Sequence, residues 1–297
     1  MKLASDCYEC LRRLIRQAAE LATDDDSLRQ AAISEATRTL DDEFSYDQLS
    51  IVIATGIHKL IMEVTGNPDP YWAKKEQEMM LARQLYSEMS SEGRLARWAL
   101  SGWGREPESP SSPELGASVR LAAAGNSLDF FRETSAVAED IRGRVSFSVD
   151  DSPELEAKLR SADTVLYLAD NAGEIYFDLP LVRLIRRSAR VIYAVKPSPV
   201  QNDLTLEDVK RSGLENELGE VMSTGIASPG VVFSLASAQF RREFDAADLI
   251  FAKGMGHYEA LSELPPQGRV FHCLMAKCRP VAASLGVPLN AYVGMLR

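Results

Sequence analysis

The sequence has no apolar run of the roughly 18 residues that a membrane-spanning helix needs. Its first residues, MKLASDCYECLRR, turn charged at once and lack the apolar centre of a signal peptide. Cysteine is scarce as well, because 4 in 297 residues are too few for a disulfide framework. We therefore expect a cytoplasmic protein in a reducing compartment, with no membrane partner.

Several catalytic and nucleotide-binding signatures are missing. Neither the phosphate-loop pattern G-x-x-x-x-G-K-[ST] nor a G-x-G-x-x-G after a strand occurs, which argues against a dinucleotide site. The G-x-S-x-G elbow of serine hydrolases is missing too. Of the 3 histidines, His58 falls in an apolar helical segment and His272 in a strand, so only His257 is placed near a predicted site.

Acidic side chains outnumber basic ones. The chain carries 43 acidic and 33 basic residues, a formal net charge of −10. A negative field of this size repels nucleic acid and anionic membranes and favours cations. We expect no nucleic-acid partner, and an anionic substrate would need a metal ion or local lysines to overcome the field.

The hydrophobic pattern divides the chain. Residues 1–100 show apolar residues at three- and four-residue steps and no strand pattern, which predicts an N-terminal all-helical domain. Within it, helices after the first are expected at 27–40, at 46–64 and from Pro70 onward. Residues 101–118 are rich in serine, proline and glycine and are predicted to form a linker or mobile loop.

Residues 119–297 form the second part, which opens on a helix predicted at 118–124. Short apolar runs there are predicted as strands at 165–169, 191–195, 249–252 and 270–275. Amphipathic segments between the runs are predicted as helices, for example at 179–187 and 229–240. Unbroken apolar strands alternating with helices indicate an α/β fold with a mostly parallel sheet covered on both faces.

Polar side chains gather where the first two of these strands end, and the groups are Asp170, Asn171, Glu174, Lys196, Asn202 and Asp203. Because ligands bind beyond the carboxyl ends of the strands in an open parallel sheet, we expect these groups to share one crevice. Carboxylate and amide oxygens are the ligands that Mg²⁺ and Mn²⁺ prefer. The alternative is that Asp170 and Asp203 are helix N-caps, and one residue can serve both purposes.

Three further segments are candidates for binding an anion or lining the crevice. Lys253 with Gly254 and Gly256 combines an ammonium group with glycines whose amides can approach a phosphate closely. Ser228 lies in a small-residue loop, TGIASPG, that opens a predicted helix. The segment GNSLD supplies Asn126 and Asp129. An ordinary turn and a helix cap are the plainer interpretations of the first and the last of these patterns.

The cysteines allow two interpretations. Cys7 and Cys10 form a C-x2-C pair, and Cys278 lies near the end of the last predicted strand, so the three are candidates for a second metal site or a redox site. The spacing of Cys273 and Cys278 is not that of a usual zinc site, however. Cys7 and Cys10 also match the apolar stripe of the first helix, so the simplest interpretation is that they are buried small hydrophobes.

Several motifs in order along the chain resemble the damage-control phosphatase family, also known as domain of unknown function 89. The motifs are LADNAGEIYFDLPLV, KPSPVQNDLTLEDV, STGIASPG and FAKGMGHYE, with TGNPDPY and AAAGNSLDF upstream. CYEC and LMAKCRPVA are similar to the small archaeal and bacterial branch of that family. The resemblance covers nearly the whole chain except the linker at 101–118.

The resemblance implies a three-layer α/β/α domain with an N-terminal helical domain packed on it. It also implies a metabolite-repair phosphatase that hydrolyses small phosphate monoesters, such as sugar phosphates or damaged phosphometabolites, with one divalent metal (Mn, Mg, Co or Ni). Asp170, Asn171 and Asp203 match the family's metal ligands, Lys253 its phosphate-binding lysine, and Asn126 and Asp129 its site-lining pair.

The implied mechanism is attack by metal-activated water, with Asp170 or Glu174 as the base. Direct attack by Asp170 is less favoured, because Ala172 occupies the second position of the Asp-x-Asp motif that such phosphatases use. Two other functions stay open. One is non-hydrolytic binding of a metal or phosphometabolite, and the other is carboxyl methylation, which has been proposed for a eukaryotic relative.

Overall fold

The structure of the protein is a computed structural model that describes residues 1–90, 112–127 and 145–297. Most of the predicted linker and Asp129 lie outside these described residues. Within them, no helix is both long and apolar enough to cross a membrane.

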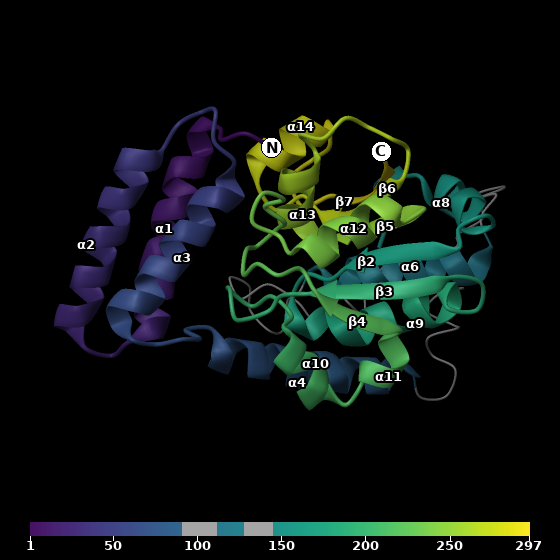
Figure 1. Ribbon diagram of the computed structural model, residues 1–297, viewed down its shortest axis with the longest axis horizontal. Coiled ribbons are helices and arrows are strands. Elements are labelled where there is room, and N and C mark those ends of the chain that lie inside the picture. The colour runs from purple at the N-terminus through teal and green to yellow at the C-terminus, as the bar shows by residue number, and fades with distance from the viewer. Residues whose placement is uncertain (91–111, 128–144) are drawn as a thin grey trace.

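A seven-stranded sheet forms the centre of the molecule, in the order β1-β7-β6-β5-β2-β3-β4 (Figure 1). Neighbouring strands run parallel except for β6 and β7, which pair antiparallel. The strands are β1 (Phe147–Asp150), β2 (Thr164–Leu168), β3 (Arg190–Val195), β4 (Glu220–Ser223), β5 (Leu249–Lys253), β6 (Val270–Met275) and β7 (Tyr292–Leu296). The mostly parallel α/β sheet expected from the sequence is therefore confirmed.

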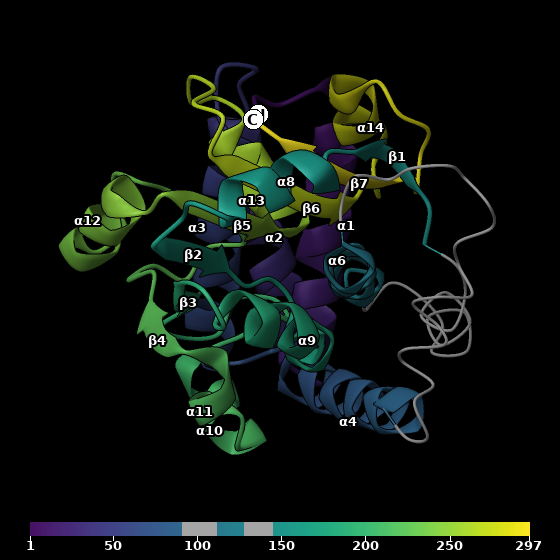
Figure 2. The same cartoon turned by 90° about the vertical axis from the view of Figure 1, so that its right-hand side faces the viewer.

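Helices cover both faces of the sheet, because alternate side chains of the buried strands are apolar on both sides. One face packs on α6 (Pro113–Gly125), α8 (Ser152–Leu159) and α9 (Ile175–Ile185). The other packs on α12 (Ala238–Ala246) and α13 (Gly254–Leu261) (Figure 2). The remaining elements of this part are η2 (Ala172–Glu174), α10 (Leu206–Ser212), α11 (Glu215–Leu218) and α14 (Arg279–Leu285).

The N-terminal helices divide between two cores. The helices α1 (Ser5–Ala22), α2 (Asp26–Glu43) and α3 (Ser50–Thr65) pack on one another beside the α/β part (Figure 1). The helix α4 (Trp72–Ser90) instead buries Met79, Ala82 and Leu85 in the core of the sheet, against α9 and η2. α4 therefore shares its core with the α/β part, although it lies within the predicted 1–100 domain.

Three other sequence predictions need correction. α6 begins at Pro113 with Ser112 as its N-cap, so 113–118 is helical and does not belong to a linker. The segment predicted as a helix at 229–240 is mostly loop, because Ser237 caps a helix that begins only at Ala238. β1, β4 and β7 were not predicted, and each shows only partial burial along its length.

Candidate functional site

The loops after β2 and β3 are joined by backbone hydrogen bonds. Leu204 N donates to Asp170 O at 2.8 Å and Ala172 N donates to Asn202 O at 2.8 Å. Asn171 and Asp203 pair between them as an isolated antiparallel bridge. The three residues predicted as metal ligands therefore lie on adjoining loops at one edge of the sheet, as the topology rule requires.

The helix-cap interpretation fails for both aspartates. The N-cap of α10 is Thr205, whose side chain accepts from Asp208 N, so Asp203 lies outside the cap. Asn171 precedes η2 and makes no side-chain cap bond. Asp170 and Asp203 are both buried, and their carboxylates are directed to other polar side chains.

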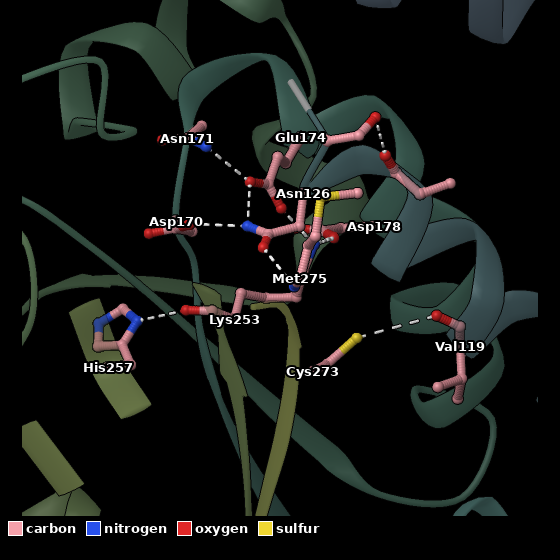
Figure 3. Close-up of polar contacts among 12 residues, drawn as sticks. Val119, Asn126, Asp170, Asn171, Glu174, Asp178, Lys253, His257, Cys273 and Met275 are labelled. Carbon is pink, nitrogen blue, oxygen red and sulfur yellow. Dashed lines mark hydrogen bonds and ion pairs between the residues drawn. The ribbon is translucent and has the colours of Figure 1, made fainter. Parts of the chain in front are cut away.

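Asn126, at the C-terminal end of α6, links three segments of the site (Figure 3). Its Nδ2 donates to Asp170 Oδ2 and to Glu174 Oε1, each at 2.9 Å. Its Oδ1 accepts from Met275 N at 3.0 Å, at the end of β6. Asn126 therefore holds the two carboxylates side by side with an amide donor between them. Asp129, its predicted companion, lies outside the described residues.

Glu174 also belongs to a buried charge cluster with Lys253 and Asp178. Lys253 Nζ lies 2.6 Å from Glu174 Oε2 and 2.7 Å from Asp178 Oδ1. Asn171 Nδ2 donates to Glu174 Oε1 at 2.9 Å, and Tyr193 donates to Asp178 Oδ2 at 2.8 Å. Both oxygens of Glu174 therefore already have partners within the protein.

Lys196, directly after β3, is a second buried ammonium group at the site. Its Nζ donates to Gly230 O at 3.0 Å and lies 3.5 Å from Asp203 Oδ2. It also lies 3.5 Å from His257 Nε2, while His257 Nδ1 is 2.8 Å from Lys253 O. Lys196 therefore lies where the Asp203 loop, the 228–230 loop and the first turn of α13 meet.

Two glycines allow these segments to approach. A Cβ on Gly254, whose φ is +77°, would lie 1.9 Å from Asp170 Oδ2. A Cβ on Gly256 would lie 2.0 Å from Pro229 O. Only a residue without a side chain fits at either place. The sequence predicted that these glycines allow a phosphate to approach closely, whereas the close neighbours in the structure are other segments of the protein.

Burial dominates the electrostatics of the site. Desolvation, with the neighbouring charges of Glu174 and Asp203, raises the pKa of Asp170 well above its usual range. Burial likewise raises the pKa of Asp203 to about 7, although the Lys196 ammonium opposes that shift. Burial also lowers the pKa of Lys196 and, together with Lys196, that of His257. The pKa of Lys253 is raised, because the nearby Asp178 and Glu174 carboxylates outweigh its burial.

The buried groups carry an excess of negative charge. Four buried carboxylates (Asp170, Glu174, Asp178 and Asp203) face only two buried ammonium groups (Lys196 and Lys253). With all four carboxylates ionised, the excess negative charge would be offset by a hard dication together with Lys277, whose charge also reaches Asp170. In the described parts of the chain, no three His, Cys, Asp or Glu side chains are grouped so as to hold a metal. A metal ion between Asp170 and Asp203 would therefore need a ligand of another kind, and the amide oxygen of Asn171 on the same loop is the candidate.

Residues from the N-terminal helices reach the edge of the site. Glu78 on α4 accepts from Asn202 Nδ2 at 2.8 Å, next to Asp203. Thr55 on α3 donates to Ser228 Oγ at 2.9 Å, so the predicted anion-binding hydroxyl is bonded to another helix. These contacts join α3 and α4 to the loops of the site.

Cys273 lies beside Lys253 on the neighbouring strand, whereas the other three cysteines are on α1 and at the start of α14. All four carry free thiols, and Cys10 is exposed, so the interpretation of Cys10 as a buried hydrophobe is wrong. α1 contacts α14, whose N-cap is Cys278, so Cys7, Cys10 and Cys278 lie in one region. Burial raises the pKa of Cys278 to about 12, which disfavours its thiolate form. The second metal or redox site stays a prediction.

Sequence reasoning placed Lys196 and His257 at or near the site, but it did not assign Asp178 or Glu78 to it. Asp178 follows Glu174 by four residues, a spacing that places both on one face of a helix and that was visible in the sequence. Lys196 was visible as a charged residue at a strand end. Glu78 had no such signal, because α4 reaches the site only through tertiary packing.

Comparison with known proteins shows the family of this chain. The family model described as Damage-control phosphatase ARMT1-like domain matches residues 3–293. The chain belongs to this family. A damage-control phosphatase of Pyrococcus horikoshii is 34% identical to it over 303 residues, which cover 99% of this chain and 98% of that protein. A damage-control phosphatase of Archaeoglobus fulgidus is 30% identical over 301 residues, again with 99% and 98% covered.

A solved structure of the damage-control phosphatase family agrees with the fold. The crystal structure of a DUF89 family protein from Pyrococcus horikoshii has a TM-score of 0.85 and 34% sequence identity, and covers 100% of this chain and 99% of that one. The family resemblance and the α/β fold with a helical N-terminal region are thus both confirmed.

Proposed function

We propose that this protein is a divalent-metal-dependent phosphatase that hydrolyses small phosphate monoesters, such as sugar phosphates or damaged phosphometabolites. The observation that carries the proposal is the cluster of buried carboxylates on and beside the adjoining Asp170 and Asp203 loops. The names of its relatives in Pyrococcus horikoshii and Archaeoglobus fulgidus support the reaction class.

Asp170, Asn171 and Asp203 would hold one divalent ion such as Mn²⁺, Mg²⁺, Co²⁺ or Ni²⁺. When bound, such an ion neutralises phosphoryl oxygens and lowers the pKa of a coordinated water. Asn126 keeps Asp170 oriented, because its Nδ2 donates to Asp170 Oδ2. Lys196 supplies positive charge that offsets the negative field of the chain for an incoming phosphate.

Hydrolysis needs one proton acceptor for the attacking water. The water oxygen forms a bond to phosphorus, the ester P–O bond breaks, and the leaving alkoxide takes a proton from solvent. Glu174 is a poor acceptor, because its oxygens already accept from Asn126, Asn171 and Lys253. Asp170 is the better choice, since Asn126 occupies only one of its two oxygens.

The proposal is tested with p-nitrophenyl phosphate and a panel of phosphorylated metabolites, each with Mn²⁺, Mg²⁺, Co²⁺ and Ni²⁺. We expect turnover by the wild type with at least one ion and loss of about 100-fold or more in Asp170→Asn and Asp203→Asn. Melting curves of both variants check that they fold. No turnover by the wild type with any ion would favour non-hydrolytic binding, and equal turnover by both variants would reject the assigned ligands.

A further inference from the structure

The two buried ammonium groups of the site are held very differently. Lys253 makes two short contacts, at 2.6 and 2.7 Å, and both are to carboxylates. Lys196 donates to the uncharged carbonyl oxygen of Gly230 at 3.0 Å and makes a longer contact, at 3.5 Å, with His257 Nε2. Its single carboxylate neighbour, Asp203, lies at 3.5 Å. Lys253 is therefore matched by two close carboxylates, whereas Lys196 has only the longer ion pair with Asp203 within 4 Å among the described residues.

The third neighbour of Lys196 is uncharged as well. His257 Nδ1 lies 2.8 Å from the carbonyl oxygen of Lys253, a contact that requires the proton on Nδ1. Nε2 is then a lone-pair acceptor 3.5 Å from Lys196 Nζ. His257 therefore orients the ammonium group without neutralising its charge.

Lys196 also lies on the correct side of the cluster for a metal-bound anion. Asp203, a proposed metal ligand, is its carboxylate neighbour, and Asp170 is close enough to feel its charge. Lys253 contacts Glu174 Oε2, whereas Asn126 and Asn171 donate to Glu174 Oε1, so the Glu174 carboxylate stands between the lysine and the two amides (Figure 3). A phosphate on an ion held by Asp170 and Asp203 would thus be placed next to Lys196.

We propose that Lys196, and not Lys253, is the lysine that binds the phosphoryl oxygens of the substrate. This inference rests on the proposed function and assigns one binding residue within it. Lys196 turns one N–H from its long contact with Asp203 to a non-bridging phosphoryl oxygen, while Gly230 O and His257 hold the other two. Lys253 then serves as a fixed counter-charge that orients Glu174 and Asp178.

Calorimetric titration of inorganic phosphate into Mn²⁺-loaded protein tests the assignment without turnover. The variants are Lys196→Met and Lys253→Met, which remove the charge but keep most of the side-chain volume. A charge-assisted hydrogen bond contributes enough that we expect the Kd of phosphate to rise at least about 10-fold in Lys196→Met. In Lys253→Met we expect it to change less than about 3-fold, by the same reasoning, since no contact to phosphate is lost.

Two controls separate phosphate binding from other effects. Titration of Mn²⁺ alone shows whether the metal site is intact. If Lys196 acts on phosphate, the Kd of Mn²⁺ in Lys196→Met should stay within about 3-fold of the wild-type value. Lys253→Met leaves Glu174 and Asp178 buried without their cation and is expected to melt at a lower temperature. If it does not fold, Lys196→Arg, which keeps the charge, is compared with Lys196→Met and should retain the tighter phosphate binding.

The outcomes are distinct. A phosphate Kd in Lys196→Met near that of the wild type, a larger loss in Lys253→Met, or equal loss in Lys196→Arg and Lys196→Met would each overturn the assignment. A loss of Mn²⁺ affinity with unchanged phosphate affinity would overturn it too, in favour of a role in positioning Asp203. If the wild type binds phosphate through Lys196 but turns over no ester, the proposed function fails and the assignment stands.

Discussion

At Gly254 the backbone passes so close to Asp170 that a side chain does not fit. The Gly254 φ of +77° suits glycine, and an added Cβ would lie 1.9 Å from Asp170 Oδ2. We expect Gly254→Ala to displace the carboxylate and lower both phosphatase activity and Mn²⁺ affinity by at least about 10-fold, since a metal ligand must be placed to within about 0.5 Å. Activity assays and Mn²⁺ titration measure the two effects.

Gly213 provides the matched control, because it has a similar φ of +72° and open space around it. Gly213→Ala should lower the free energy of unfolding by about 1 kcal/mol through backbone strain alone and leave activity unchanged. If both variants lose activity equally, the effect comes from strain in a left-handed backbone and the contact with Asp170 is unimportant.

His272 is a buried histidine on β6 that serves no part of the site. Across the described residues, neither of its ring nitrogens has a hydrogen-bond partner, and its ring lies edge-on to Tyr258 at 5.3 Å. Burial lowers its pKa to about 3. The folded protein therefore holds it neutral at a pH where the unfolded chain protonates it.

We expect His272→Leu to stabilise the protein, because an unsatisfied buried imidazole costs roughly 1–3 kcal/mol. Its stability advantage over the wild type should grow by about 1.4 kcal/mol for each pH unit as pH falls from about 6.5 toward 3, since only the wild type must exclude a proton. Urea unfolding at pH 7.5, 6 and 5 measures this. A pH-independent difference would show that His272 titrates alike in both states.

At the scale of elements, α4 is joined to the α/β core by a buried ion pair. Lys75 Nζ lies 2.8 Å from Asp69 Oδ2 and 3.4 Å from Asp208 Oδ2, and its side chain is 2% exposed. Asp208 also belongs to the capping box of α10. One lysine thus connects α4 to the helix that follows the Asp203 loop.

We expect Lys75→Met to lower the free energy of unfolding by about 3 kcal/mol, because it removes the buried cation between Asp69 and Asp208 and leaves Asp208 with only Arg211 at 3.8 Å. Lys59→Met, which removes an exposed lysine 3.8 Å from Glu63, should leave the stability unchanged within error. Denaturant unfolding of both variants provides the comparison. Equal stability of the two would mean that α4 is held by its apolar contacts alone.

Elements that are buried on both faces could be predicted from the sequence, and others could not. β2, β3, β5 and β6 are nearly continuous apolar runs, a pattern typical of central parallel strands. β1 and β4 are edge strands of four residues with partly exposed side chains. The 229–240 segment was wrongly predicted as a helix, because its apolar residues are buried although most of it is a loop. Val231 and Ala236 lie in the same core as α12.

At the scale of the whole molecule, the site draws on residues that are distant in the chain. The sequence could place Asp170, Asn171 and Asp203 together, because a rule of topology applies to strand ends. It could not show that Lys253 is enclosed by Glu174 and Asp178, or that Glu78 reaches Asn202 from α4. Such pairings depend on packing distances of a few ångströms, which residue type and spacing do not encode.

The most direct test of the proposed metal site is anomalous diffraction from crystals of the protein soaked in Mn²⁺. We predict one strong peak within about 2.5 Å of oxygens from Asp170, Asn171 and Asp203, and its loss in Asp203→Asn crystals. A peak at another place in the molecule, or the same peak retained in Asp203→Asn, would contradict the site.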